Sequence, residues 1–470
     1  MPFATDHPLL IPEISLHISR FVAIKDAIAC ARVCKAWNDP FTSAVWHTVN
    51  FKAQKRFVET DPVIIKKHGN RVRVVKRISA SVQLEVLHKA GVCLLQRFSL
   101  VMQTQAQFQA LYFDLLYRNA NSLTRMEIGH AEDCDKLVVF PVGLMSSCAG
   151  SHASFKLVRL CITNLAMTRD AFASLLKLCP ALKFLEVQRT SIYSYSSCPE
   201  PFRHTGLVHL NASLEQIFQP DPGSLTNVPI LVHLPRLKRI STALAEPDAL
   251  TPVSFGAMKD QFAKYCHSLG EVVLTTAPIT TTALLTRTFR SLTMISISAE
   301  KMSIDVITAM LVHQETLSRV IAAVHRQSDR DSELEGQPTI PGWALQLIPQ
   351  TCSRLTRLYF QPFTLDMEEI ERTTWSCNQL EELHIQIRGL DTKEKIDRAM
   401  RLWTNCRDTR RKSKKGNSAN GSGLHSSSTQ SGLEKDTLRN GKSLEERVAR
   451  HLARFEKLRV VRLCQKGGSA

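Results

Sequence analysis

His130, Asp133, Cys134 and Asp135 place four side chains of the kinds that bind metal ions within six residues. Zinc sites use imidazole, thiolate and carboxylate donors, but they commonly contain Cys-x-x-Cys pairs, and this chain has none. The surrounding stretch is polar, which favours an exposed loop over a metal centre. The sequence also lacks the G-x-S-x-G, Walker-type and H-E-x-x-H motifs. We therefore expect no catalytic residues, no metal site and no cofactor.

A run of basic residues lies towards the C-terminal end: Arg407, Arg410, Arg411, Lys412, Lys414 and Lys415. Three interpretations stay open. The run is a solvated linker, a nuclear-import signal, or a contact for nucleic acid. Aromatic residues are not interleaved with the basic ones, so the run does not resemble a stacking platform for single strands.

Beyond these residues, the chain repeats a sequence motif, Cys-x-x-Leu-x-x-Leu/Val, which is expected to form the strands and helices that carry them. Four copies begin at Cys179, Cys266, Cys352 and Cys377, and looser copies centre on Leu123, Leu157, Leu237, Leu292, Leu317 and Leu458. The intervals 157–182, 292–317 and 355–380 are each 25 residues. Leucines repeating every 20–29 residues or so are typical of leucine-rich repeats. One strand and one helix cannot bury an apolar face alone, so we expect an α/β solenoid, curved as a horseshoe.

Within the repeats, side chains beside the second apolar position should point away from the core, because side chains alternate along a strand. In a horseshoe these positions line the concave face. The expected binding surface comprises Arg77, Arg97, Arg125, Arg159, Phe184, Arg239, Arg319, Arg357 and Tyr359. Adjacent strands lie about 4.8 Å apart, so the first four arginines would form a ladder.

Two interpretations of that ladder stay open. It is a groove for an acidic or phosphorylated segment, which would relieve repulsion of about 1 kcal/mol per pair in bulk water. Alternatively, arginine is simply a solvated surface residue whose long side chain extends into water. Glu127 and Glu186 would partly neutralise the face and favour the second interpretation.

The order of the chain divides it into four parts. Residues 1–50 differ from the rest, residues 51–404 hold the repeats with a proline-rich loop insertion at 188–230, and a shorter break falls at 324–341. Residues 405–445 have low complexity without apolar periodicity, which predicts a disordered insertion. Residues 446–470 return to the repeat pattern.

Composition indicates a folded protein. The chain has 470 residues, 44% hydrophobic and 22% charged, with a net charge of +17. Its 13 cysteines are odd in number and several share one repeat position, which favours buried thiols in a reducing compartment. Residues 1–21 lack the pattern of a secretory signal, and no apolar run is long enough to span a membrane. We expect the cytoplasm, the nucleus or both, without membrane association.

The first fifty residues predict three short helices. The first opens around Pro12 and Glu13, with Ile14, Ile18 and Phe21 on one stripe. A second should run from about 26 to 37 and stop at Asn38-Asp39-Pro40, and a third should carry Val45 and Trp46. This much apolar surface makes a poor independent core.

This segment resembles the F-box. The likeness rests on the start Ile11-Pro12-Glu13-Ile14, the centre Val33-Cys34-Lys35-x-Trp37 and the late Trp46. Ile11 replaces the usual leucine, and Ser15 stands where leucine is common. Together with the repeats, the chain is similar to F-box/leucine-rich-repeat proteins in the divergent style common in fungi. The resemblance implies an adaptor-binding surface formed by Ile11, Pro12, Ile14, Ile18, Phe21, Val33, Cys34 and Trp37.

The resemblance implies a non-catalytic receptor subunit of a Skp–cullin–F-box ubiquitin ligase. The helices would bind a Skp-type adaptor and through it cullin, while the repeats would bind a protein substrate, acidic or phosphorylated. Two alternatives stay open. One is an interaction scaffold outside any ligase, and the other, less favoured, is a basic solenoid that binds nucleic acid.

Overall fold

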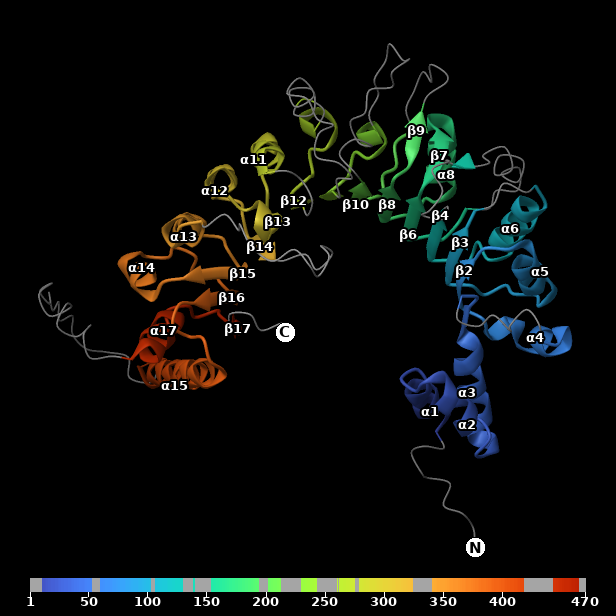
Figure 1. The fold of residues 1–470 in the computed structure, drawn as a ribbon, viewed down its shortest axis with the longest axis horizontal. Helices are drawn as coiled ribbons and strands as arrows, with labels where there is room; N and C mark the ends of the chain where they lie inside the picture. The colour runs from blue at the N-terminus through green and yellow to red at the C-terminus, as the bar shows by residue number, and fades with distance from the viewer. Residues whose placement is uncertain are drawn as a thin grey trace, which may run out of the picture. The chain divides into compact units, whose positions relative to one another are not determined.

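The structure is a computed structural model that describes residues 11–52, 60–102, 106–129, 138–139, 154–193, 202–212, 230–242, 260, 262–274, 279–323, 340–417 and 443–464. It divides into two compact units. Unit 1 comprises Met1–Leu237 with Tyr265–Ser268, and unit 2 comprises Lys238–Lys264 with Leu269–Ala470. The elements of both are labelled in Figure 1.

Unit 1 begins with three helices, α1 (Pro12–Ser19), α2 (Ile24–Cys30) and α3 (Lys35–His47). Pro12 occupies the first turn of α1, as expected. The second predicted helix is wrong in its extent, because α2 ends at Cys30 and Cys34 is in extended conformation before α3. Pro40 does not stop a helix either. It lies inside α3 and is buried, so packing outweighs the local cost of a helical proline.

The rest of unit 1 repeats strands and helices. Its main sheet is parallel, in the order β1 (Thr48–Asn50), β2 (Val74–Ile78), β3 (Arg97–Val101), β4 (Arg125–Gly129), β6 (Arg159–Thr163), β8 (Phe184–Gln188) and β10 (His209–Ala212). A second parallel sheet contains β5 (Val138–Val139), β7 (Leu165–Thr168) and β9 (Ser191–Tyr193). The helical segments are α4 (Pro62–His68), η3 (Gly69–Arg71), α5 (Ser81–Lys89), α6 (Ala106–Arg118), α8 (Arg169–Leu178) and η5 (Ile230–His233).

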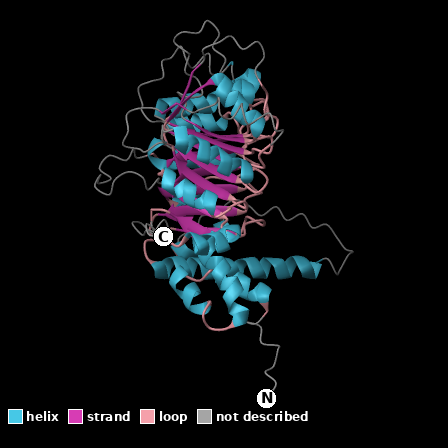
Figure 2. Cartoon of the chain, turned by 90° about the vertical axis from the view of Figure 1, so that its right-hand side faces the viewer, coloured by secondary structure: helices cyan, strands magenta, loops and turns pink. Residues whose placement is uncertain are grey.

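Unit 2 continues the same alternation. Its parallel strands follow the order β11 (Arg239–Thr242), β12 (Glu271–Leu274), β13 (Met294–Ser298), β14 (Arg319–Ala323), β15 (Arg357–Leu365), β16 (Glu382–Ile387) and β17 (Val460–Leu463). Its helices are α11 (Ile279–Thr288), η6 (Ala299–Lys301), α12 (Ile304–Leu311), α13 (Gly342–Thr351), α14 (Met367–Arg372), α15 (Lys393–Asn417) and α17 (Leu444–Leu452). In Figure 1 helices α11, α12, α13 and α14 lie along one side of strands β12 to β16, and Figure 2 colours the alternating strands and helices by type.

The repeated leucines make the core between strands and helices. Leu157, Leu160, Leu182 and Leu185 are all 0% exposed, and strands such as β6 and β8 alternate between buried and half-buried residues. Each buried leucine contributes roughly 1.5–3 kcal/mol of transfer free energy. The predicted α/β order, three N-terminal helices followed by stacked strand–helix repeats, is confirmed.

Two predicted boundaries are wrong. Strand β10 lies within the predicted loop insertion 188–230 and pairs with β8, so Leu207 and Leu210 belong to a further repeat. The predicted disordered insertion 405–445 begins too early, because α15 continues to Asn417. The many prolines in 188–230 led to the prediction of a loop there, and the basic composition after residue 405 led to the prediction of disorder. Residues 418–442 and most of the break at 324–341 lie outside the described residues.

Backbone groups between successive repeats are joined by buried polar side chains. The Asn119 amide accepts a hydrogen bond from the Leu95 N–H at 2.7 Å and donates to the Val92 and Leu115 carbonyls at 3.1 and 2.8 Å. His204 and His313 make equivalent bridges. Each donates from Nε2 to a carbonyl of the preceding repeat, at 2.9 Å to Cys179 and 2.7 Å to Thr286. These three side chains fix the spacing of the repeats that they join.

Candidate functional site

The N-terminal helices present two surfaces of opposite character. Toward one another they bury small or compact residues, and Ser15, Ser19 and Ala27 are each at most 2% exposed. The large apolar side chains lie outside: Ile11, Ile14, Leu16, Phe21, Ile24, Ile28 and Val33 are between 38% and 78% exposed. An isolated domain would bury these side chains. So many large apolar side chains left exposed on three short helices indicate an interaction surface.

The predicted adaptor-binding residues fall largely on that surface. Ile11, Pro12, Ile14, Phe21, Val33 and Cys34 are exposed, while Ile18 and Trp37 are half-buried. The Trp37 ring packs on Phe41 with centroids 5.4 Å apart. Leu16, Ile24 and Ile28 were not predicted, although their apolar character next to the motif residues is a visible signal. Ser15 faces the interior, so it does not interrupt the exposed apolar surface.

The face of each sheet away from the helices, here called the strand face, carries the predicted arginines. Arg97, Arg125 and Arg159 stand in register on β3, β4 and β6, followed by Phe184 and His209. Arg77 does not join them. The β2–β3 register shifts between Val75 and Ile78, so Val74 stands opposite Arg97. Arg77 itself has a φ of 58°, which marks the irregularity. Three arginines form the ladder rather than the expected four.

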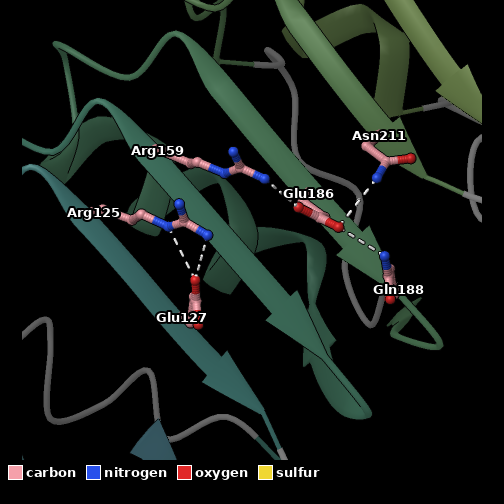
Figure 3. Close-up of polar contacts among 6 residues, drawn as sticks. All are labelled: Arg125, Glu127, Arg159, Glu186, Gln188 and Asn211. Atoms are coloured by element: carbon pink, nitrogen blue, oxygen red, sulfur yellow. Dashed lines mark hydrogen bonds and ion pairs between the residues drawn. The ribbon is translucent and has the colours of Figure 1, made fainter. Parts of the chain in front are cut away.

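Carboxylates neutralise most of this ladder (Figure 3). Arg125 donates to Glu127 through Nε and Nη2 at 2.9 and 2.6 Å, and Arg159 donates to Glu186 at 3.0 Å. The Arg159 guanidinium also lies 4.0 Å from the centre of the Phe184 ring. Glu186 accepts further hydrogen bonds from Gln188 and Asn211 at 2.7 and 3.1 Å. These pairs relieve the repulsion that an acidic ligand was expected to relieve.

The strand face of unit 2 is neutralised in the same way. Glu271 lies between two arginines, 3.7 Å from Arg239 and 2.7 Å from Arg319. Arg357 pairs with Glu382 at 3.2 Å, and the same carboxylate accepts from the Tyr359 hydroxyl. Burial and that hydrogen bond raise the pKa of Tyr359. Both ladders are therefore mixed in charge.

The thiols of Cys161, Cys179 and Cys266 are structural rather than reactive. Cys161 lies on the strand face between the ion pairs of unit 1, and burial first, then Glu186 and Glu127, raises its pKa to about 12. Burial alone raises the pKa values of Cys179 and Cys266 to about 12. A thiol with such a pKa is a weak nucleophile at neutral pH because the thiolate is the reactive form.

The predicted metal ligands and the predicted basic run differ in how far the structure describes them. Residues 130–135, the candidate metal ligands, lie outside the side chains that the structure describes, and elsewhere among described residues no three His, Cys, Asp or Glu side chains gather around a metal position. Arg407 and Arg410 lie on α15. Arg407 is 5.6 Å from the Trp403 ring and Arg410 donates to the Ala453 carbonyl at 2.8 Å. They are part of a folded helix, not of a linker.

Sequence comparison identifies the N-terminal segment. The F-box-like family matches residues 12–52, the span of α1–α3 and β1. The chain thus carries an F-box-like domain ahead of repeats of the leucine-rich type. Curated proteins give no match. In the described part of the chain, no helix is both long and apolar enough to cross a membrane.

Two solved structures are among those similar to this chain. The crystal structure of the mouse RP105/MD-1 complex has a TM-score of 0.30 and 12% identity, covering 71% of this chain and 45% of that one. The crystal structure of the TLR13–ssRNA13 complex has a TM-score of 0.31 and 14% identity, covering 71% and 43%. The chain spans less than half the length of either.

Proposed function

We propose that this chain is the substrate-binding subunit of a Skp–cullin–F-box ubiquitin ligase. The F-box-like helices bind a Skp-type adaptor, and the repeats bind the protein that is to be modified. The observation that supports this most is the set of exposed apolar side chains on α1, α2 and the turn between them, where Ile14 is 38% and Phe21 78% exposed. Exposed apolar side chains of this number favour a partner that covers them.

The subunit performs no chemistry in this proposal. It raises the effective concentration of substrate lysines near a charged conjugating enzyme, and proximity of this kind is sufficient to accelerate transfer. The proposal gives the strand faces the role of substrate contact. Side chains there combine arginine, tyrosine and phenylalanine, and aromatic residues and arginine are the types enriched where protein interfaces bind most strongly.

Changing Pro12 and Ile14 together to alanine should weaken adaptor binding at least about tenfold, because burying an isoleucine side chain is worth roughly 1.5–3 kcal/mol. Both residues are exposed, so the fold should be unaffected. The measurement is co-purification of the adaptor with the full chain. A matched control is Val63→Ala on α4, an apolar side chain that is 73% exposed and lies outside the F-box-like helices.

Undiminished adaptor recovery by the double variant would reject the ligase assignment. Mass spectrometry of proteins that co-purify with the full chain, compared with a chain lacking residues 1–50, distinguishes this function from a scaffold outside any ligase. A scaffold would retain its partners without the F-box-like helices. A ligase receptor would lose the adaptor and cullin and keep the substrate.

A further inference from the structure

Several basic residues without a carboxylate partner lie where the F-box-like helices meet the first repeats. Five residues there have no ion pair with any described carboxylate: Arg20, Arg73, Lys76, Arg77 and Arg97. By contrast, Arg125 and Arg159 on the following strands are both paired. These five residues and His47 are here called the N-terminal basic cluster.

Backbone hydrogen bonds hold the cluster together. The Arg73 N–H donates to the His47 carbonyl at 3.0 Å, and the Arg73 carbonyl accepts from Gln96 and Arg97 at 2.7 and 3.0 Å. His47 ends α3, Arg73 precedes β2 and Arg97 begins β3. The F-box-like domain and the first two long strands therefore each contribute to one patch.

The electrostatic surroundings of His47 are all cationic. Burial, and then Arg73, Arg20 and Arg97 in that order, lower its pKa, and its Nδ1 shares a hydrogen bond with the Thr48 hydroxyl at 3.1 Å. The Arg73 guanidinium is oriented by the Asn70 and Val72 carbonyls, to which it donates at 2.5 and 3.2 Å. These acceptors are neutral and leave its charge uncompensated.

The cluster is wider than one anion. Lys76 stands two residues after Val74, the register partner of Arg97, so it shares the face of Arg97. Lys76 lies two positions, about 7 Å, along β2 from the position opposite Arg97. Carboxylates spaced along an extended peptide match cations that are spread over two neighbouring strands in this way. The breadth of the patch therefore favours several separated carboxylates over a single phosphate.

We propose that the N-terminal basic cluster binds an aspartate- and glutamate-rich segment of the substrate. Calling the bound segment part of the substrate rests on the proposed function. The site for an acidic peptide itself is argued only from the residues of the cluster. It replaces the arginine ladder as the anion site, since Glu127 and Glu186 already occupy Arg125 and Arg159. The acidic segment would lie directly beside the adaptor-binding helices, so the F-box-like domain itself contributes Arg20 and His47 to substrate recognition.

The test uses the full chain and a fluorescein-labelled peptide of alternating Glu and Gly, followed by fluorescence anisotropy. Lys76→Gln with Arg97→Gln should weaken binding at least about tenfold, because hydrogen bonds between charged groups are among the strongest in proteins. Both side chains are exposed, so folding should be retained. Lys66→Gln with Lys67→Gln on α4 removes the same net charge from exposed positions and should leave binding nearly unchanged.

A variant that is expected to strengthen peptide binding shows that weaker binding by the others is not caused by unfolding. Glu127→Gln frees the guanidinium of Arg125, the register partner of Arg97, and should tighten peptide binding about threefold, a modest gain appropriate to a partly exposed charge. The adaptor is measured separately with the same proteins. If the unmodified chain binds the peptide but no adaptor, the proposed function is rejected and the peptide site is retained.

Three results would overturn the proposal. The first is the absence of binding to the Glu-Gly peptide. The second is equal weakening by the two glutamine pairs, which would mean that only net charge matters. The third is preference for a Gln-Gly peptide carrying one phosphoserine over the Glu-Gly peptide, which would assign the cluster to phosphate instead.

Discussion

Replacing Asn119 by alanine is expected to lower the free energy of unfolding of unit 1 by about 3–5 kcal/mol, a large effect for one substitution. The side chain is 1% exposed and makes three hydrogen bonds to the backbone. Without it, the Leu95 N–H and the Val92 and Leu115 carbonyls stay buried without that partner. Each buried polar group left unsatisfied costs about 1–3 kcal/mol.

Chemical denaturation of the full chain checks this, followed by hydrogen exchange of amides in α5, α6 and β3. Asn121→Ala, two residues further along at an exposed position, is the matched control and should change stability by less than about 0.5 kcal/mol. If both alanine variants lose the same small amount, the amide of Asn119 does not join the repeats.

The role of Asn119 shows what the sequence hides. It lies four residues before Leu123, and His313 lies four before Leu317. Other repeats place a buried cysteine at a similar offset, such as Cys179 before Leu182. The position three or four residues before the repeat leucine is therefore polar in some repeats and apolar in others. The leucine spacing predicts the repeats because burial repeats with the strands, but the polar bridges become visible only when two repeats lie side by side.

The strand face was predictable in part for a related reason. Alternation along a strand predicts that Arg97, Arg125 and Arg159 share a face, and their register confirms it. The pairing of Arg125 with Glu127 involves one strand and can be read from a spacing of two. The pairing of Arg159 with Glu186 spans 27 residues and depends on β6 and β8 being neighbours.

Two features of the structure were not predicted from the sequence, and the first is an irregular backbone at Arg77. The positive φ of Arg77 and the register shift beside it remove that arginine from the ladder, and no spacing rule for strands anticipates such a shift. In the F-box-like helices, the motif identifies Ile14 and Phe21. It does not show that Ser15 and Ser19 turn inward, which is what leaves the large apolar side chains outside.

Unit 2 should lose stability in mild acid because of one buried histidine. His451 is 6% exposed and lies between Trp375 and Phe455, with ring centroids 4.9 and 5.4 Å away. Neither ring nitrogen has a hydrogen-bond partner among the described residues. Burial first, and then Arg454, lowers its pKa from 6.5 to about 4, against an opposing effect of Glu371.

The sign follows from the direction of that change. Between pH 6.5 and about 4 the unfolded chain binds a proton that the folded chain does not, so stability falls as the pH falls through this window. A pKa difference of about 2.5 corresponds to about 3 kcal/mol, fully present above pH 6.5 and lost by about pH 4. His313 and His384 also have pKa values lowered by burial and add to the slope.

A His451→Leu variant isolates the contribution of this histidine, since it keeps an apolar side chain of similar volume beside Trp375 and removes the titrating group. Its unfolding free energy at pH 7 should lie within about 1.5 kcal/mol of the unmodified chain. At pH 4 the variant should be the more stable of the two by about 1.5 kcal/mol or more, because only the unmodified chain loses the His451 contribution of about 3 kcal/mol. Parallel pH profiles for the two proteins would show that His451 protonates as readily in the folded chain as in the unfolded one, and that its burial does not govern acid stability.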